Sequence, residues 1–174
     1  MTISRIPATL ESYSGEKMRG AVKLSKIVET WSSADPWTTF YLNKVTGKII
    51  PITHLEFYEA EKPFSAEPEP DGKPDVKHVA RAILGGDERY ILIPSRYEPN
   101  ESEVMEQFCF SVVDDQVSEI LSESLNGPRG AEFFAQSLIR HGMLEEWHSY
   151  LQQALILAAK EWCEKNDIEF NEDV

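Results

Sequence analysis

The chain has 174 residues with 41% hydrophobic and 10% aromatic side chains, a composition that excludes disorder throughout and suffices for one domain with a hydrophobic core, alone or with an extension. No stretch approaches the ~18 uninterrupted apolar residues of a membrane span, which excludes a bilayer-spanning protein. The net charge of −13 is uneven: residues 1–50 carry +3 and the remainder −16, so broad nucleic-acid binding by residues 51–174 is not expected.

The first predicted element is a helix over residues 16–31, whose apolar residues recur at a loose helical spacing. These positions are Met18, Val22, Ile27 and Trp31. The turn-forming sequence SSADP then ends the helix. Residues 1–37 are therefore predicted to be an N-terminal helical segment, followed by a single α+β domain over residues 38–174.

The sequence TTFYLNKVTGKIIPI predicts a β-hairpin over residues 38–53. Aromatic and β-branched residues flank a turn at residues 44–47, in which Gly47 is placed for a positive φ. A short helical start, LEFYEA, follows the hairpin. The chain then enters a Pro/Glu-rich segment, which predicts a solvated loop at about residues 62–77.

Two short elements are predicted after this loop. The sequence DVKHVARAIL indicates a helix, which Gly85 and Gly86 end. RYILIP indicates a strand, which Pro94 closes. This strand is expected to pair with the hairpin, so that residues 38–53 and 88–93 form a small antiparallel sheet.

The rest of the chain is predicted to be helical, from apolar residues at helical spacing. The predicted helices cover residues 101–113, 115–125, 130–140 and 143–165. Seven apolar side chains of the last helix fall within an arc of roughly 100°. Ile156 and Leu157 lie outside that arc, so this helix is either enclosed by the core or meets a second subunit there.

These elements together predict the α+β class. A small antiparallel sheet, the hairpin plus one strand, is expected to pack with a C-terminal α-helical bundle of residues 99–165. No internal repeat is visible in the sequence. The fold is therefore expected to be a single sheet-and-bundle domain and not a repeat array.

Three blocks of the sequence resemble, in order and spacing, the uncharacterised bacterial protein family UPF0158. The blocks are FYLNKVTGKIIPI, then ERYILIP with VMEQF about a dozen residues on, then GPRGAEFFAQSL followed by Trp147 and Trp162. The resemblance covers roughly residues 38–170, with the segment at 62–77 unmatched. It supports the fold and its unity as one domain, and it implies no established activity, substrate or catalytic residues.

The chain departs from the pattern of this family at two places. The family's Gly-x-Gly joint is typically followed by basic residues and an aspartate, whereas residues 132–137 have no basic residue. The charged residues usual between the two tryptophans are replaced by LQQALILAA. A charged functional surface of the family at these positions would therefore be lost or changed in this member.

The segment LNGPRGAEFFAQ raises the question of a phosphate-binding loop. Helix N-termini attract anions, but a Walker-type loop needs a preceding strand and a Lys-Ser or Lys-Thr pair, and here a predicted helix precedes. The Asn-Gly-Pro sequence instead indicates the end of one helix, with Gly130 allowing close approach of the next. We interpret the segment as a structural joint, and Arg129 and Gly130 as a candidate contact for an anion or a partner.

His141, Glu145 and His148 have the i, i+4, i+7 spacing that would place metal ligands on one helical face. Gly142 is expected to interrupt that helix, and the H-E-x-x-H order of a catalytic zinc site is absent. We interpret the three residues as lying at the boundary of the apolar face. Neither a metal nor another cofactor is expected.

No catalytic constellation is predicted either. Asp114 and Asp115 lie between two predicted helices, where an aspartate is a good N-cap, and not an acid–base pair. No serine has an evident histidine partner, and G-x-S-x-G is absent. Cys109 and Cys163 lie outside any C-x-x-C pattern and are interpreted as reduced core thiols of an unsecreted protein. Because the first ten residues lack the apolar run of a secretory signal, a cytoplasmic location is expected.

Charge and aromatic residues suggest two kinds of partner. Residues 98–126 carry eight acidic side chains and no Lys or Arg, which is compatible with a basic protein partner, although such acids can also simply keep helices in solution. Aromatic residues beside lysines in the N-terminal part could stack on single-stranded bases, but core packing is the favoured interpretation. These aromatic residues are Trp31, Trp37, Phe40, Tyr41, Phe57 and Tyr58.

The leading hypothesis from the sequence is a cytoplasmic, non-enzymatic protein that acts through a protein partner, with a regulatory role as its extension. A homodimer through Ile156 and Leu157 is a further hypothesis, and no membrane partner is expected. The first alternative is a nucleic-acid-associated accessory protein that uses the +3 segment of residues 1–50. The second is an enzyme whose site is scattered along the sequence.

Overall fold

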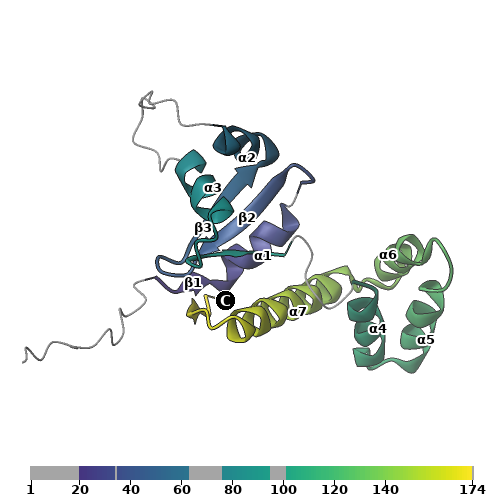
Figure 1. Ribbon diagram of the computed structural model, residues 1–174. Helices are drawn as coiled ribbons and strands as arrows, with labels where there is room; N and C mark the ends of the chain where they lie inside the picture. Colours follow the sequence, from purple (N-terminus) through teal and green to yellow (C-terminus); the bar gives the residue numbers. More distant parts are fainter. Residues whose placement is uncertain (1–19, 34, 63–75, 95–100, 174) are drawn as a thin grey trace, which may run out of the picture.

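The computed structural model describes residues 20–33, 35–62, 76–94 and 101–173, and within them the chain forms seven helices and five short strands (Figure 1). The first half holds β1 (Val22–Lys23), α1 (Leu24–Ser32), β2 (Thr38–Asn43), β3 (Lys48–Thr53), α2 (His54–Glu61), α3 (Val76–Leu84) and β4 (Tyr90–Leu92). The second half holds α4 (Glu101–Ser111), α5 (Asp115–Ser124), α6 (Gly130–His141), α7 (Leu144–Lys165) and β5 (Phe170–Asn171). The α+β class predicted from the sequence is confirmed.

The strands β2, β3 and β4 form an antiparallel sheet in the order β3-β2-β4, which confirms the predicted hairpin and its third strand. The Asn43 side-chain oxygen holds the turn between β2 and β3, since it accepts hydrogen bonds from the backbone N–H groups of Val45 and Thr46. Gly47 has the predicted positive φ, +67°. Most of the predicted Pro/Glu-rich loop, residues 63–75, lies outside the described residues.

The N-terminal helix begins at Leu24 and not at residue 16, so the prediction is wrong for residues 20–23. Residues 16–19 lie outside the described part of the chain. The physical reason is a long-range backbone pairing: β1 pairs in parallel with β5 near the other end of the chain, and this pairing overrides the helical spacing of the apolar residues. Neither strand was predicted, because a two-residue strand carries no readable alternation.

Helices cover both faces of the sheet (Figure 1). On one face Leu42, which lies opposite Ile49 and Ile91 on the flanking strands, packs with α1 and the carboxy-terminal half of α7. On the other face, α2 and α3 enclose Ile52. The ring of Tyr41 meets the ring of Phe57 edge-on there, at 5.9 Å between centroids. The sheet is thus the middle layer of three.

A third core lies at the other end of α7, away from the two cores on the faces of the sheet (Figure 1). We call α4, α5, α6 and residues 144–154 of α7 the helical unit. Its central residue is Phe108, whose ring meets those of Phe134, Trp147 and Tyr150 edge-on at centroid distances of 6.2, 5.3 and 5.3 Å. Leu151 packs against this core and against the core between the sheet, α1 and α7, so the sheet meets the predicted bundle through α7.

The ends of the helices agree with the sequence signals. Asp114 caps α5 as predicted, because its carboxylate accepts hydrogen bonds from the backbone N–H groups of Gln116 and Val117 at 3.0 and 3.1 Å. Gly142, with a φ of +68°, ends α6 as predicted. In the described part of the chain, no helix combines the length and the apolar character that a bilayer crossing requires.

Candidate functional site

The segment between α5 and α6 forms a tight joint between the two helices. Gly127 adopts a φ of +87°, and the side-chain amide of Asn126 donates to the carbonyl oxygen of Glu123 in the last turn of α5. Gly130 is buried at the start of α6, and a β-carbon there would lie 2.2 Å from the carbonyl oxygen of Leu125. The joint therefore brings two backbones into direct contact, which only glycine permits.

Arg129, the candidate anion contact, is engaged by its own helix. Its guanidinium donates to both carboxylate oxygens of Glu132, at 2.8 and 2.6 Å, and lies 5.0 Å from the centre of the Phe133 ring. The hydrogen bonds to Glu132 raise the pKa of the Arg129 guanidinium above its ordinary, already high value. The positive charge at this helix N-terminus is thus balanced by a neighbouring carboxylate on the protein surface.

The two residues singled out as an oligomer contact occupy different environments. Ile156 is half-buried and packs against the core formed by the sheet, α1 and α7. Leu157 is 56% exposed. The intramolecular core therefore accounts for Ile156, and Leu157 alone remains at the surface.

The histidines and cysteines do not assemble a reactive site. His141 ends α6, whereas Glu145 and His148 lie on α7, and all three are exposed. Within the described residues, no three His, Cys, Asp or Glu side chains are grouped so as to hold a metal ion. Burial raises the pKa of the Cys109 thiol, and raises that of Cys163 to about 12 with help from the nearby Glu164 charge. Both thiols therefore stay protonated near neutral pH and are poor nucleophiles.

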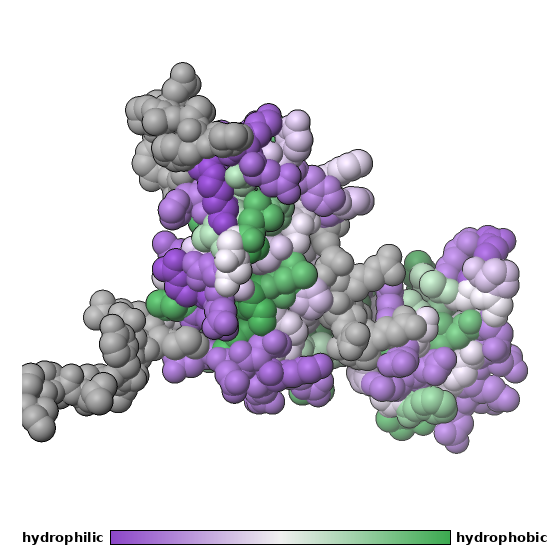
Figure 2. Space-filling view, in the orientation of Figure 1, coloured by the Kyte–Doolittle hydropathy of each residue, from purple (hydrophilic) through white to green (hydrophobic). Residues whose placement is uncertain are grey.

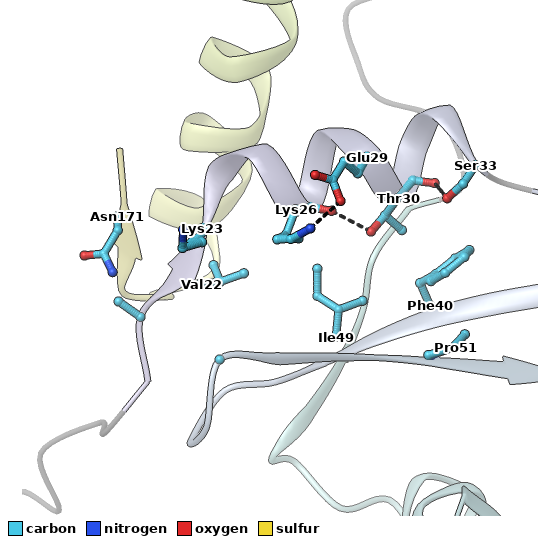
Figure 3. Close-up of a pocket in the computed structure, with 12 residues that line it drawn as sticks. Val22, Lys23, Lys26, Glu29, Thr30, Ser33, Phe40, Ile49, Pro51 and Asn171 are labelled. Carbon is cyan, nitrogen blue, oxygen red and sulfur yellow. Dashed lines mark hydrogen bonds and ion pairs between the residues drawn. The ribbon is translucent and has the colours of Figure 1, made fainter. Parts of the chain in front are cut away.

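One hollow of the surface lies between α1 and the hairpin, with a volume of about 500 Å³ (Figure 3). Phe40, Ile49 and Pro51 of the sheet form its apolar side. Two lysines stand at its polar side, but each is paired with an acid: Lys26 with Glu29 at 2.7 Å, and Lys23 with Asp173 at 3.5 Å. The hollow consequently presents little unbalanced charge to a ligand.

A second hollow, also of about 500 Å³, lies in the helical unit where α4, α5 and α7 meet. We call it the α4–α5–α7 groove. Its apolar lining comprises Phe108, Val112, Val113, Val117, Met143 and Tyr150. Its polar lining comprises Ser111, Asp114, Glu146, Ser149 and Gln153. The groove thus combines an apolar floor with two carboxylates and has no cation in its lining.

Two large apolar side chains stand at the surface near the end of α4, and one of them, Val113, belongs to the groove lining. Phe110 is 80% exposed and Val113 is 97% exposed, at the end of α4 and in the short connection to α5. Figure 2 shows apolar atoms at this end of the helical unit, surrounded by hydrophilic atoms. Because burying each such side chain contributes roughly 1.5–3 kcal/mol at most, leaving them in water is unfavourable unless another molecule covers them.

The charged side chains of α4, α5 and the connection between them are all acidic. Residues 101–128 contain seven acidic residues and no Lys, Arg or His. The exposed face of α4 carries Glu103, Glu106 and Phe110, at the spacing of three and four residues that places side chains in one stripe. The helical unit therefore presents an apolar patch in a field that attracts cations.

A family model matches residues 20–173, which is nearly the whole chain, and its description is "Uncharacterised protein family (UPF0158)". The chain belongs to the UPF0158 family. The match confirms the resemblance expected from the sequence and extends it to β1 and α1 at one end and β5 at the other. Neither a search of curated proteins nor a search of solved structures finds a match.

The sequence of this UPF0158 chain identifies the acidic residues of this region but not the exposed apolar side chains of Phe110 and Val113. Val104, Met105, Phe108 and Val112 recur at helical spacing within the predicted helix of residues 101–113, and all four are buried or half-buried in the structure. Phe110 and Val113 lie off that arc, and this was the available signal. A large apolar residue outside the buried face of an amphipathic helix is a candidate contact for a partner.

Proposed function

We propose that the chain is a cytoplasmic, non-enzymatic protein that acts by binding a basic protein partner on its helical unit. The observation that supports this proposal most directly is the α4–α5–α7 groove, whose lining includes the exposed Val113, in a helical unit whose residues 101–128 carry acids and no Lys, Arg or His. Interfaces of this kind use apolar anchors for affinity and charge complementarity for encounter and specificity. A regulatory role follows if the partner is an enzyme or a nucleic-acid-binding protein.

The proposal is tested by capturing partners with the tagged chain from its own cells, in parallel with two variants. A Phe110→Ser/Val113→Ser double variant removes the two exposed apolar side chains near the end of α4, of which Val113 lines the groove. Ile139→Ser removes a side chain that is 66% exposed on α6, outside the groove lining, and serves as the matched control. Cross-linking and mass spectrometry then identify the captured proteins and the helices they touch.

We expect a basic protein in stoichiometric amount, cross-linked to α4 or α5, retained by the control variant and lost with the double variant. Capture that is the same for both variants would contradict docking at this groove. Clean protein without any partner would contradict the binding function itself.

The nucleic-acid alternative has less support from the geometry. Phe40, Tyr41 and Phe57 pack against the cores of the sheet, as favoured from the sequence, whereas Trp37 and Tyr58 are exposed. The lysines of the hollow in Figure 3 are paired with acids, as described above. Nuclease-sensitive absorbance of the purified protein distinguishes this alternative.

The enzyme alternative would need titratable groups converging in a pocket. The described carboxylates whose pKa is lowered are dispersed over the surface: Asp35 beside Trp37 and Thr38, Asp87 beside Arg89, and Asp173 beside Ser25. Each is explained by local hydrogen bonds. The homodimer hypothesis now depends on Leu157, and light scattering of the wild-type protein and a Leu157→Ser variant at high concentration tests it.

A further inference from the structure

The shape of the α4–α5–α7 groove limits the class of partner segment that it can hold. This inference rests on the proposed function, the binding of a basic protein partner to the helical unit. Three helices form its walls, and its volume of about 500 Å³ can take more than one large side chain. The helical unit, over its described residues 101–154, contains no strand and so offers no sheet edge to an extended peptide. Among the recurring modes of peptide recognition, a helix laid in a groove is the one that this surface fits.

The carboxy-terminal end of α4 gives a second, independent reason to expect a cationic partner. Cations stabilise the carboxy-terminal end of a helix, where the backbone dipole is negative. The helices α6 and α7 have such cations, Arg140 and Lys165, in their last turns, whereas α4 and α5 have none. The negative end of α4 opens directly beside the groove, since Ser111 and Val112 line it.

Two serine hydroxyl groups donate hydrogen bonds to carbonyl oxygens at this end of α4, but they carry no positive charge that would neutralise its negative dipole. Ser111 donates to the carbonyl oxygen of Phe108 at 2.7 Å, and Ser118 donates to that of Cys109 at 2.8 Å. Asp114 and Glu146 stand at the same groove and add two full negative charges. A lysine or arginine of the partner would therefore meet a helix end and two carboxylates that no cation of residues 101–128 balances.

We propose that the occupant of the groove is a cationic amphipathic helix of the partner, which inserts large apolar side chains between α4, α5 and α7 and places Lys or Arg beside Asp114, Glu146 and the end of α4. An acidic segment is repelled by this surface, and so is an anionic lipid headgroup.

The proposal is tested by fluorescence anisotropy with synthetic peptides and the full chain. The probe is a helix of about 18 residues with Leu and one Trp on one face and Lys on the other. Three control peptides have the same length: one with the same composition in scrambled order, one with Glu in place of Lys, and one with two central prolines that prevent a helix.

We expect saturable binding of the probe, weakened by high salt, and at least roughly tenfold weaker binding of each control peptide. The Val113→Asp and Glu146→Lys variants should each weaken binding of the probe by a similar factor, whereas Ile139→Ser should leave it unchanged. Circular dichroism of each variant checks that the helical unit is folded, because all three positions are exposed.

Equal binding of the scrambled peptide and the probe would overturn the proposal, because bare charge attraction would then suffice. Equal or tighter binding of the proline-containing peptide would also overturn it, in favour of an extended basic segment. If no peptide binds while capture of the natural partner still depends on Phe110 and Val113, the helix proposal fails and the proposed function stands. If capture does not depend on these residues, the docking surface itself is wrong.

Discussion

Gly130 at the start of α6 lies so close to Leu125 at the end of α5 that a β-carbon on the glycine would come within 2.2 Å of the leucine's carbonyl oxygen. The neighbouring atom belongs to the backbone and not to a flexible side chain, so the contact cannot relax by a rotamer change. The direction of α6 relative to α5 therefore depends on a glycine at this position.

Gly130→Ala should destabilise the protein by about 1–3 kcal/mol, because the added methyl group forces two helix ends apart. Urea unfolding followed by circular dichroism measures the change. Gly85→Ala is the matched control, since a β-carbon there has its nearest neighbour at 3.3 Å, and its effect should be much smaller. Equal stability of the Gly130→Ala variant and the wild type would contradict the tight joint.

Two phenylalanines of α4 should differ sharply in their contribution to stability. Phe108 is the centre of the ring cluster of the helical unit and is buried, so Phe108→Ala should cost about 3–5 kcal/mol. Phe110 is 80% exposed, so Phe110→Ala should change the free energy of unfolding by no more than about 0.5 kcal/mol. Thermal or urea unfolding measures both. A large loss for Phe110→Ala would mean that this ring is part of the core.

The elements that were predicted correctly are those with strong local signals. The hairpin has Gly47 at the required φ, α5 has Asp114 as its cap, and α6 ends at Gly142. The long helix α7 buries the predicted apolar arc. In each case a local backbone requirement or a helical spacing is enough to decide the structure.

The features that the sequence could not supply depend on pairs of residues far apart in the chain. The pairing of β1 with β5 joins segments almost 150 residues apart and shortens the predicted first helix. The enclosure of Ile156 depends on α1 and the sheet, which helical projection of α7 alone cannot include. The groove arises from the meeting of α4, α5 and α7, although its acids and its unburied Phe110 could be read from the sequence.

Arg129 provides a test of the anion contact considered from the sequence. Because Glu132 already accepts hydrogen bonds from Nε and Nη2 of the guanidinium, we expect phosphate to show no saturable binding that depends on Arg129. Arg129→Gln should also leave the midpoint of thermal unfolding nearly unchanged, since exposed ion pairs contribute little. Titration calorimetry with inorganic phosphate and thermal unfolding measure the two effects. Loss of a phosphate signal in Arg129→Gln would instead support an anion site.

The buried thiol of Cys163 should make the protein less stable in alkali. Its pKa is about 12 in the folded protein against an ordinary value of 9.0, so the protonated form is the one that the fold retains. Below about pH 9 the thiol is protonated in both states and its contribution is fully present. Between about pH 9 and pH 12 the unfolded chain loses the proton and the folded chain keeps it, so the free energy of unfolding falls as the pH rises.

Urea unfolding at about pH 8 and about pH 10 measures this loss, and a Cys163→Ala variant isolates it from other groups that titrate in the same range. The variant is expected to be less stable than the wild type at both values, because the substitution leaves a cavity, but its stability should fall less between them. Labelling with a thiol reagent at the lower pH gives an independent readout, since both buried cysteines should react only after unfolding. An equal fall in the variant and the wild type would show that Cys163 does not carry the effect.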